Sequence, residues 1–480
     1  MTGNNSETEK LSEFIASLPY SYKITKHARE ITENYSAYEG KKVSIAGRSM
    51  AVRRAGKLVF IDVQDQSGKI QAYFDFKELG EEAFSSVKGF NSGDIIGVEG
   101  TVFKTTPGQI SINVKSCKLL AKALRVLPDK WHGMQDVELR YRKRHLDLIM
   151  NPEVKRVFEI RSRLVSLLRS FLNKEGFMEV ETPIIQPIYG GAAAQPFKTH
   201  VNTLDEDDYL RISDELYLKR MIIGGFEKVF EVGKDFRNED ADTKHNPEFT
   251  QVEWYQAYAD YEDMMDLTER MLSHIVKEIF GTYEITYQGK KISFKPPFKR
   301  MKFVDSVNEA VGKDILKLSD KELLAIADKH GIKMESWERN RAHTYDKLHK
   351  TLVQPKIVDP TFIIDYPAGT TALCRPKRGN PDLIERFEPV AAGIKFGNAY
   401  TELNNPIIQR QNFEKEMQKK EEGDRETEPL DMDFVEAMEQ GMPPTGGVGI
   451  GIDRLTMLLT DKTSIKEVIL FPMEKRGKQQ

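Results

Sequence analysis

Hydrophobic and polar residues alternate in two neighbouring segments near the middle of the chain. In residues 229–237 and again in residues 249–255, one face is apolar apart from Lys234. This period of two predicts extended strands, because successive side chains of a strand point to opposite faces. The opposite faces carry polar side chains: Glu231, Asp235, Arg237, Glu253 and Tyr255. The segments predict a hairpin whose charged loop could wrap a ligand; a hairpin with a solvated outer face is the alternative, although such a face more often carries Lys, Thr and Ser.

Five shorter alternating segments fill residues 42–120 and are separated by turn sequences. This spacing predicts a small antiparallel barrel of the size of an OB-fold. Phe60 and Gln71 fall on consecutive strands, and three arginines lie near them in the sequence: Arg48, Arg53 and Arg54. An aromatic ring, an amide and guanidinium groups suit an unstacked base of single-stranded RNA. The pattern fits equally well a Phe60 that belongs to the core and arginines that are solvated.

Apolar residues at helical spacing predict several further helices, and shorter apolar segments predict strands. After a polar lead with a short helix, the predicted helices are residues 137–150, 155–175, 262–280, 319–330, 341–352 and a highly charged 409–428. Strands are predicted at 177–185, where Pro183 stops the strand, at 362–367, and around 383–393 and 394–406. Residues 446–459 predict a glycine-rich strand that runs into an amphipathic helix.

The composition is that of a folded, soluble protein with more than one domain. The 480 residues exceed what one ordinary core supports, and 39% of them are hydrophobic. No apolar run reaches the roughly 18 residues of a membrane span, and the N-terminus has no apolar signal core. Cys117 and Cys374 lie far apart, which favours a reducing compartment, the cytoplasm. The net charge of −3 means that any nucleic-acid binding must come from local patches.

Three groups of residues on these predicted strands could carry chemistry. They are Arg237, Glu239, His245, Phe249, Glu253 and Tyr255; then Glu385, Glu388, Asn398, Tyr400 and Glu402; and Gly447, Gly449 and Gly451 ahead of Asp453 and Arg454. Taken singly, each group also fits a solvated strand face or tight helix–strand packing. Glycines at alternate strand positions leave a flat floor for a planar ring.

Arginines together with carboxylates suit a polyphosphate with its metal ions, because arginine offers a planar charged fork and carboxylates hold Mg²⁺. The chain contains no GxxxxGK[ST] sequence, which excludes a P-loop. The glycines of residues 447–451 are not followed by a strand–helix–strand unit, so a dinucleotide fingerprint is rejected.

Long segments of the chain, in order, resemble class II aminoacyl-tRNA synthetases and, more narrowly, lysyl-tRNA synthetases. GFMEVETPII resembles the motif of the dimer interface, GKDFRNEDADTKHNPEFTQVEWYQAY the second motif of the class and GGVGIGIDRLTMLL the third. Segments of the lysyl type are HGMQDVELRYRKRHLDLIMN, GGAAAQPFKTH, RISDELYLKR, NAYTELNNP and GMPPTGG. The resemblance covers nearly the whole chain and implies an α+β fold. An N-terminal OB-fold β-barrel would precede a class II synthetase catalytic domain built on an antiparallel sheet flanked by helices.

The resemblance also implies a division of the chain. Residues 1–38 would form a helical lead, 39–126 an OB-fold anticodon-binding domain, 127–150 a linker and 151–480 the catalytic domain, with a helical insertion at about 300–355. The implied partners are ATP, L-lysine and the tRNA for lysine. A homodimer is implied as well, and no membrane.

Roles of single residues follow from the resemblance. For ATP, Arg237 would contact the α-phosphate and the amino-acid carboxylate, Phe249 would stack on adenine and Arg454 would hold the γ-phosphate. The nucleotide site would be completed by Glu239, His245, Gly451 and, as a Mg²⁺ ligand, Glu388. The lysine site would be formed by Gly191, Glu215, Glu253, Tyr255, Asn398, Tyr400 and Glu402. In the barrel, Phe60 would stack on an anticodon base, Gln71 would read its edge and Arg53 would lie close by.

The acids Glu253 and Glu402 favour lysine over aspartate or asparagine as the substrate. A charge-assisted hydrogen bond contributes roughly 1.5–3 kcal/mol. A substrate without the ammonium would leave these acceptors unpaired, which gives discrimination on the order of 10⁴.

One position departs from the family's pattern. Where the family has Gly-x-Glu, this chain has Gly393, Ile394 and Lys395, and the missing glutamate is a main Mg²⁺ ligand beside Glu388. We hypothesise that the ammonium of Lys395 replaces part of the metal's charge, so that fewer Mg²⁺ ions bind with ATP; crippled adenylation is the opposing possibility. Asn405, where the family usually has aspartate, is a milder change.

The sequence thus favours an ATP-dependent ligase that charges the tRNA for lysine. An aspartyl- or asparaginyl-tRNA synthetase is one alternative. A non-catalytic RNA-binding paralogue, motivated by Lys395 alone, is another. An enzyme that lysylates a protein is disfavoured, since such proteins lack the N-terminal barrel.

Overall fold

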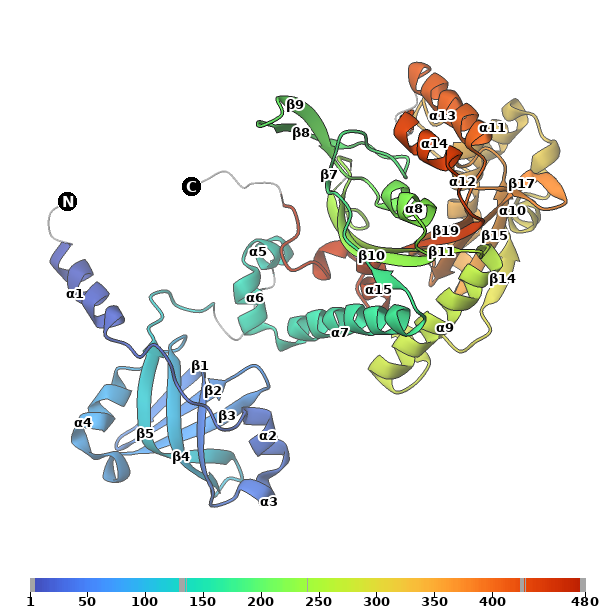
Figure 1. Cartoon of the computed structure of the whole chain (residues 1–480). Coiled ribbons are helices and arrows are strands. Elements are labelled where there is room, and N and C mark those ends of the chain that lie inside the picture. The colour runs from blue at the N-terminus through green and yellow to red at the C-terminus, as the bar shows by residue number, and fades with distance from the viewer. Residues whose placement is uncertain are drawn as a thin grey trace. The chain divides into compact units, whose positions relative to one another are not determined.

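The computed structural model describes residues 5–128, 134, 136–239, 241–423, 427 and 429–474, with side chains from residue 7 onward. Most of the stretch 129–135 of the predicted linker lies outside the described residues. The chain forms two compact units, Met1–Gly133 and Met134–Gln480. Figure 1 shows the first in blue to cyan and the second in teal to red.

Five strands of the first unit close into a barrel, as the alternating segments predict, but it is not wholly antiparallel, because its third and fifth strands pair in parallel. They are β1 (Lys42–Ala55), β2 (Leu58–Gln64), β3 (Lys69–Asp75), β4 (Ile95–Lys104) and β5 (Ile110–Ala121), in the order β1-β2-β3-β5-β4. Every second residue of β2 (Val59, Ile61 and Val63) is buried in the barrel core. Helix α4 (Phe76–Lys88) adds Phe84 to this core. Helices α1 (Asn5–Ala16), α2 (Ala28–Glu33) and α3 (Tyr35–Tyr38) precede the barrel.

A ten-stranded sheet forms the centre of the second unit. Its main path is β14 (Lys299–Lys302), β15 (Thr361–Pro367), β17 (Asn380–Ala391), β19 (Gly397–Thr401), β20 (Thr445–Gly451), β11 (Glu248–Ala257), β10 (Lys228–Phe236) and β6 (Met178–Glu179), and β16 (Pro376–Lys377) and β18 (Ile394–Lys395) pair with β17. Neighbouring strands from β15 to β10 run antiparallel. The hairpin predicted from alternation is therefore β10 and β11.

The two faces of this sheet differ in polarity. Val252 and Trp254 of β11 lie on the apolar face, with Val448 and Ile450 of β20, and all four are buried. This face packs against α7 (Pro152–Lys174), α9 (Tyr261–Phe280) and α15 (Ile452–Leu459), as Figure 1 shows for α7 and α9. The residues between them, such as Glu253, project from the opposite face.

The remaining elements surround the sheet. They are α5 (Val137–Arg142), α6 (Arg144–Met150), α8 (Glu215–Ile223), α10 (Phe303–Val311), α11 (Asp320–Lys329), α12 (Arg341–Leu352), α13 (Pro406–Glu421) and α14 (Met432–Glu439), with small sheets of β7 (Ile185–Gln186), β8 (Phe197–Val201) and β9 (Glu206–Leu210), and of β12 (Glu284–Tyr287) and β13 (Lys290–Ser293). None of the described helices has the length and apolar character needed to cross a membrane.

Four predicted elements were wrong in extent. The strand predicted around 394–406 is interrupted between β18 and β19 and ends at Thr401. The helix predicted at 137–150 is broken at Lys143, whose backbone is not helical, next to the buried ion pair of Arg144 with Asp147. The strand predicted at 177–185 is divided: Met178 and Glu179 form β6 and Ile185 begins β7 of another sheet, because Thr182 between them donates to the Glu231 carboxylate instead of extending the ladder. The charged helix begins earlier, at Pro406, where the Asn405 side chain caps it, and it ends at Glu421.

Candidate active site

One cavity of about 990 Å³ lies against the polar face of the central sheet. It brings together every site residue predicted in this unit except Glu388: Gly191, Glu215, Arg237, Glu239, His245, Phe249, Glu253, Tyr255, Asn398, Tyr400, Glu402, Gly451 and Arg454. Residues far apart in the sequence meet because β11, β20 and β19 are adjacent, so that Glu253 lies opposite Gly449 and Gly449 opposite Asn398.

Two acids of the second candidate group do not line this cavity. Glu385 points to the other face of β17, where it accepts hydrogen bonds from Thr401 and Arg378, so its place beside the other candidates was predicted wrongly. Glu388 is buried and lies among the cavity residues Arg386 and Lys395. The alternative of solvated strand faces fails for β10 and β11, because Glu231, Asp235 and Glu253 are all buried.

At one end of the cavity, Glu253 is a buried carboxylate held by neutral donors. It accepts hydrogen bonds from Ser213 Oγ at 3.0 Å, Gln251 Nε2 at 2.7 Å and the Tyr255 hydroxyl at 2.9 Å. Burial and the nearby charge of Glu215 raise the pKa of Glu253 to about 8. The acid has no cationic partner among the described residues, so a ligand cation would stabilise its charged form.

Two further acids at this end share one resident ammonium group. Lys219, fully buried on α8, lies 2.5 Å from both Glu215 and Glu402. These two charges outweigh burial and raise the pKa of Lys219, so it stays charged. Burial nevertheless raises the pKa of Glu402. Three acids and one lysine meet at this acidic end. The surplus of negative charge favours binding of a second ammonium.

The Glu402 carboxylate keeps acceptor capacity for such an ammonium. Within the described chain neither oxygen accepts a hydrogen bond of good geometry, although Lys219 is within ion-pair distance.

Glycines keep this end open. A Cβ atom at Gly447 would collide with the Glu402 carboxylate and the Tyr255 ring, and one at Gly191 would lie 2.9 Å from Cβ of Glu215. Gly191 also has a positive φ of 81°, which disfavours other residues.

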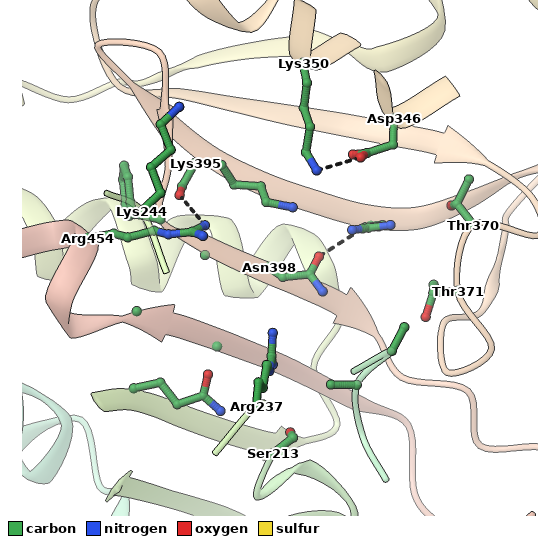
Figure 2. A pocket seen from close by; sticks show the side chains of 18 of the residues that line it. Ser213, Arg237, Lys244, Asp346, Lys350, Thr370, Thr371, Lys395, Asn398 and Arg454 are labelled. Atoms are coloured by element: carbon green, nitrogen blue, oxygen red, sulfur yellow. Dashed lines mark hydrogen bonds and ion pairs between the residues drawn. The ribbon is translucent and has the colours of Figure 1, made fainter. Parts of the chain in front are cut away.

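At the other end, guanidinium groups dominate. Arg237 lies over the Phe249 ring, 5.0 Å from its centre, and donates to the carbonyl of Ile212. Arg454 donates to the carbonyl of Lys395, and its pKa is lowered by burial and by the like charge of Arg237. In the part of the chain that the structure describes, neither arginine forms an ion pair with a carboxylate. Two mutually repelling cations in a cavity are an anion site. Figure 2 shows both side chains at this pocket together with Lys244, Lys350 and Lys395.

The predicted metal ligand Glu388 does not fit a divalent ion in this arrangement. Its Oε1 lies 2.5 Å from Arg386 and 2.9 Å from Lys395 Nζ. Burial opposes its charge, but Lys395 and Arg386 outweigh burial and lower the pKa of Glu388 to about 2. Three acids close enough to share a metal occur in the described residues elsewhere, at Asp214, Asp235 and Glu253.

In the barrel, Phe60 lies on the outer face of β2 and is half-buried, so the alternative that places it in the core is wrong. Its ring contacts Tyr73, which in turn contacts Phe103, with ring centres 5.4 and 5.5 Å apart. Gln71 shares this face and accepts a hydrogen bond from Ser111. Arg53 lies opposite Phe60, where it forms a two-point ion pair with Asp62. Arg48 and Arg54 instead donate to backbone carbonyls.

Several residues of these sites were missed from the sequence. They are Ser213, Gln251, Asp346, Lys350 and Arg386 in the cavity lining, Lys219 buried against two acids of the lining, and Tyr73 and Phe103 in the barrel. For Gln251, Arg386 and Tyr73 a signal existed, since each lies two residues from a predicted site residue on the same strand. Lys219 lies four residues after the predicted Glu215 on α8, which is the spacing of a helical ion pair, but its contact with Glu402 had no signal in the sequence.

Comparison with known proteins agrees with these features. Residues 136–475 match the family described as class II tRNA synthetases (D, K and N), and residues 43–120 match the OB-fold nucleic acid binding domain. The chain therefore has the fold of a class II tRNA synthetase preceded by an OB-fold, as the sequence predicted.

Similar relatives are named lysine–tRNA ligases. Those of Carboxydothermus hydrogenoformans and Thermotoga maritima are each 49% identical, over 97% and 96% of this chain and 96% and 93% of their own lengths. That of Clostridium novyi is 47% identical over 96% of this chain and 91% of its own. The chain belongs to the lysine–tRNA ligase family.

Proposed function

We propose that this protein activates L-lysine with ATP to lysyl-adenylate and transfers the lysyl group to the 3′ end of its tRNA. The observation that carries the proposal is the separation of charge within one cavity. Three buried acids lie with one lysine at one end, and at the other end two arginines have no carboxylate partner among the described residues. An amino acid with a side-chain ammonium and a nucleotide triphosphate complement these two ends. The relatives' shared name supports the same reading.

Lysine would bind at the acidic end. Glu253 and Glu402 would take the side-chain ammonium, Tyr255 and Tyr400 would line the pocket, and Gly191 would let the substrate approach Glu215 closely. Asn398, held by a hydrogen bond from Arg386, would orient the substrate backbone. A substrate without the ammonium would leave these buried acceptors unpaired. A site with unpaired buried acceptors rejects such a substrate strongly.

ATP would bind at the basic end, with adenine on Phe249 and the phosphates between Arg237 and Arg454. Glu239, His245 and Gly451 would line the nucleotide site. The lysine carboxylate oxygen attacks the α-phosphorus, the bond to the β-phosphate oxygen breaks, and pyrophosphate leaves. The attacking carboxylate needs no general base, so positioning and neutralisation of phosphate charge by Arg237 and Arg454 are the contributions of the protein.

Transfer follows in the same cavity. A ribose hydroxyl at the 3′ end of the tRNA attacks the carbonyl carbon of the adenylate. The bond between that carbon and the phosphate oxygen breaks, AMP leaves with the electron pair of that bond, and the hydroxyl proton passes to the leaving phosphate. The outer face of the barrel would bind the anticodon: Phe60 would stack on one base, Gln71 would contact its edge, and Arg53 would attract the backbone. Mg²⁺ would accompany ATP as a counterion held by the phosphates.

A homodimer in the cytoplasm is also proposed. Residues 177–185, which resemble the dimer-interface motif, expose large apolar side chains: Met178, Ile184 and Ile185. Exposed apolar residues gathered in one segment favour burial against a partner. Sedimentation equilibrium of the native chain and of Ile185→Asp tests this, and a monomeric native chain would contradict it.

Pyrophosphate exchange into ATP across the twenty amino acids tests the proposed function. We expect exchange with lysine and a signal at least about 10⁴-fold lower with aspartate and asparagine. Exchange with aspartate or asparagine instead would establish one alternative, and tRNA binding without exchange would establish the non-catalytic one. Charging of tRNA for lysine completes the test. The acids Glu253 and Glu402 disfavour aspartate and asparagine as substrates.

A further inference from the structure

The cluster around Lys395 is not used by the proposed reaction. Lys395 lies on β18, which pairs with β17, so that Lys395 is opposite Val390 and its ammonium reaches back to Glu388. The Lys395 side chain is 24% exposed and lines the cavity, whereas Glu388 behind it is 4% exposed. A ligand in the cavity therefore meets the ammonium and not the carboxylate.

The charges around Lys395 come from several elements. Glu388 and Arg386 belong to β17, and Asp346 and Lys350 form an ion pair on α12 with 2.7 Å between Lys350 Nζ and the carboxylate. Figure 2 shows this pair beside Lys395 and Arg454. Two acids and three cations leave the cluster with one positive charge before Arg454 is counted. Such a surplus in a cavity attracts an anion.

The identity of residue 395 decides the sign of this cluster. A glutamate there would change the charge by two units, which equals the charge of one Mg²⁺ ion, and would leave three acids against two cations. A carboxylate pair with surplus negative charge can hold a divalent ion. In this chain the ammonium of Lys395, 2.9 Å from Glu388, stands where such an ion would.

We propose that Lys395, held by Glu388, is a built-in cation that binds the polyphosphate of the nucleotide directly, so that ATP binds without a divalent ion held by the protein. Arg386 donates to the same Oε1 atom of Glu388 as Lys395 does. The proposal rests on the proposed function, because it concerns the same nucleotide site. It assigns to Lys395 the role of a binding residue.

Equilibrium binding of ATP to the full chain, by calorimetry without lysine, tests the proposal. In EDTA we expect the native chain to bind ATP within about fivefold of its affinity in Mg²⁺. Lys395→Glu should lose affinity in EDTA by about 10- to 100-fold, the range for one charge-assisted hydrogen bond or more, and should regain it with Mg²⁺. Lys395→Met should also lose affinity for ATP in EDTA. Mg²⁺ should restore little of this affinity, because methionine adds no carboxylate to hold the ion.

Two controls keep the result specific. Lys419→Glu makes the same change of charge in the lining of the same cavity, where Lys419 pairs with Glu416; its affinity in EDTA should change by no more than about twofold, since the pair is partly solvated. Electron paramagnetic resonance with Mn²⁺ and ATP counts bound ions, and Lys395→Glu should hold one more than the native chain.

The outcomes separate two failures. If the native chain binds ATP only with Mg²⁺, or holds as many Mn²⁺ ions as Lys395→Glu, the built-in cation is wrong and the proposed function stands. If ATP does not bind under any condition, the proposed function itself fails. Lys395→Met adds no third acid to the cluster. A loss of ATP affinity in this variant therefore does not come from misfolding caused by a third acid.

Discussion

Glu253 and Glu388 are both buried glutamates on the polar face of one sheet, yet their environments drive them in opposite directions. Burial and neighbouring acids raise the pKa of Glu253 to about 8. Lys395 and Arg386 lower the pKa of Glu388 to about 2 in spite of equal burial. Burial alone therefore does not decide the charge of a carboxylate; the cations within contact distance do. Among the described residues Glu253 has no cationic partner, whereas Glu388 has two.

The largest effect is expected at the basic end, from Arg237→Ala. Loss of the guanidinium should lower kcat/KM of lysine-dependent pyrophosphate exchange by about 10³-fold, the upper range for one preorganised donor at a developing charge. Arg237→Lys should recover only part of this, because an ammonium lacks the planar fork. Equal losses at Arg48→Ala, whose guanidinium donates to a carbonyl in the barrel, would break the assignment of the basic end.

The two glutamates should also differ in what they do for stability. Glu388→Gln leaves Lys395 and Arg386 without their shared counterion, so we expect a loss of about 3 kcal/mol in the free energy of unfolding at pH 7. Glu253→Gln should cost much less, because the amide can still bond to Ser213 and Tyr255 and no cation loses its partner. Chemical denaturation of both variants measures this, and a larger loss for Glu253→Gln would reverse the comparison.

Lysine affinity should depend on pH through the acidic end. The folded pKa of Glu253 lies above its ordinary value of 4.5. The folded chain therefore holds a proton that the unfolded chain has lost, and between pH 4.5 and about 8 this group makes stability fall as pH rises. Lysine binding requires the charged carboxylate, so affinity should rise about tenfold per pH unit below pH 8 and then level off.

Calorimetry in buffers of different ionisation enthalpy should detect the proton that lysine binding releases at pH 6.5. Glu253→Gln should abolish the release. A flat pH dependence in the native chain would show that Glu253 is already charged without ligand.

The smallest effect is expected in the barrel, outside both ends of the cavity. Phe60→Ala should weaken binding of the tRNA for lysine by about tenfold, within the range for one base stacked on an aromatic ring. Exchange of pyrophosphate should stay unchanged, because that reaction needs only the cavity. The matched control is Phe76→Ala, a ring that contacts Phe84 beside the barrel core. Equal weakening by both variants would indicate a general loss of barrel structure.

The sequence by itself determined the elements and most members of the sites. Alternation in residues 229–237 and 249–255 predicted the hairpin of β10 and β11, because strand geometry sends successive side chains to opposite faces. The resemblance predicted the catalytic fold and the residues around the cavity, and it singled out Lys395.

Only the tertiary structure decided what these residues meet. Glu385 belonged to the same predicted group as Glu388, but it lies on the opposite face of its strand. Lys219 reaches the acids from a helix, and the pair of Asp346 and Lys350 approaches Lys395 from another. A carboxylate's charge depends on neighbours within a few ångströms. Those of Glu388 are Arg386 and Lys395, which lie within seven residues of it in the sequence. Those of Glu253 include Glu215 of α8 and Asp235 of β10, and a local pattern carries no record of neighbours from other elements. The raised pKa of Glu253 therefore follows from tertiary packing, whereas the partners of Glu388 are largely local.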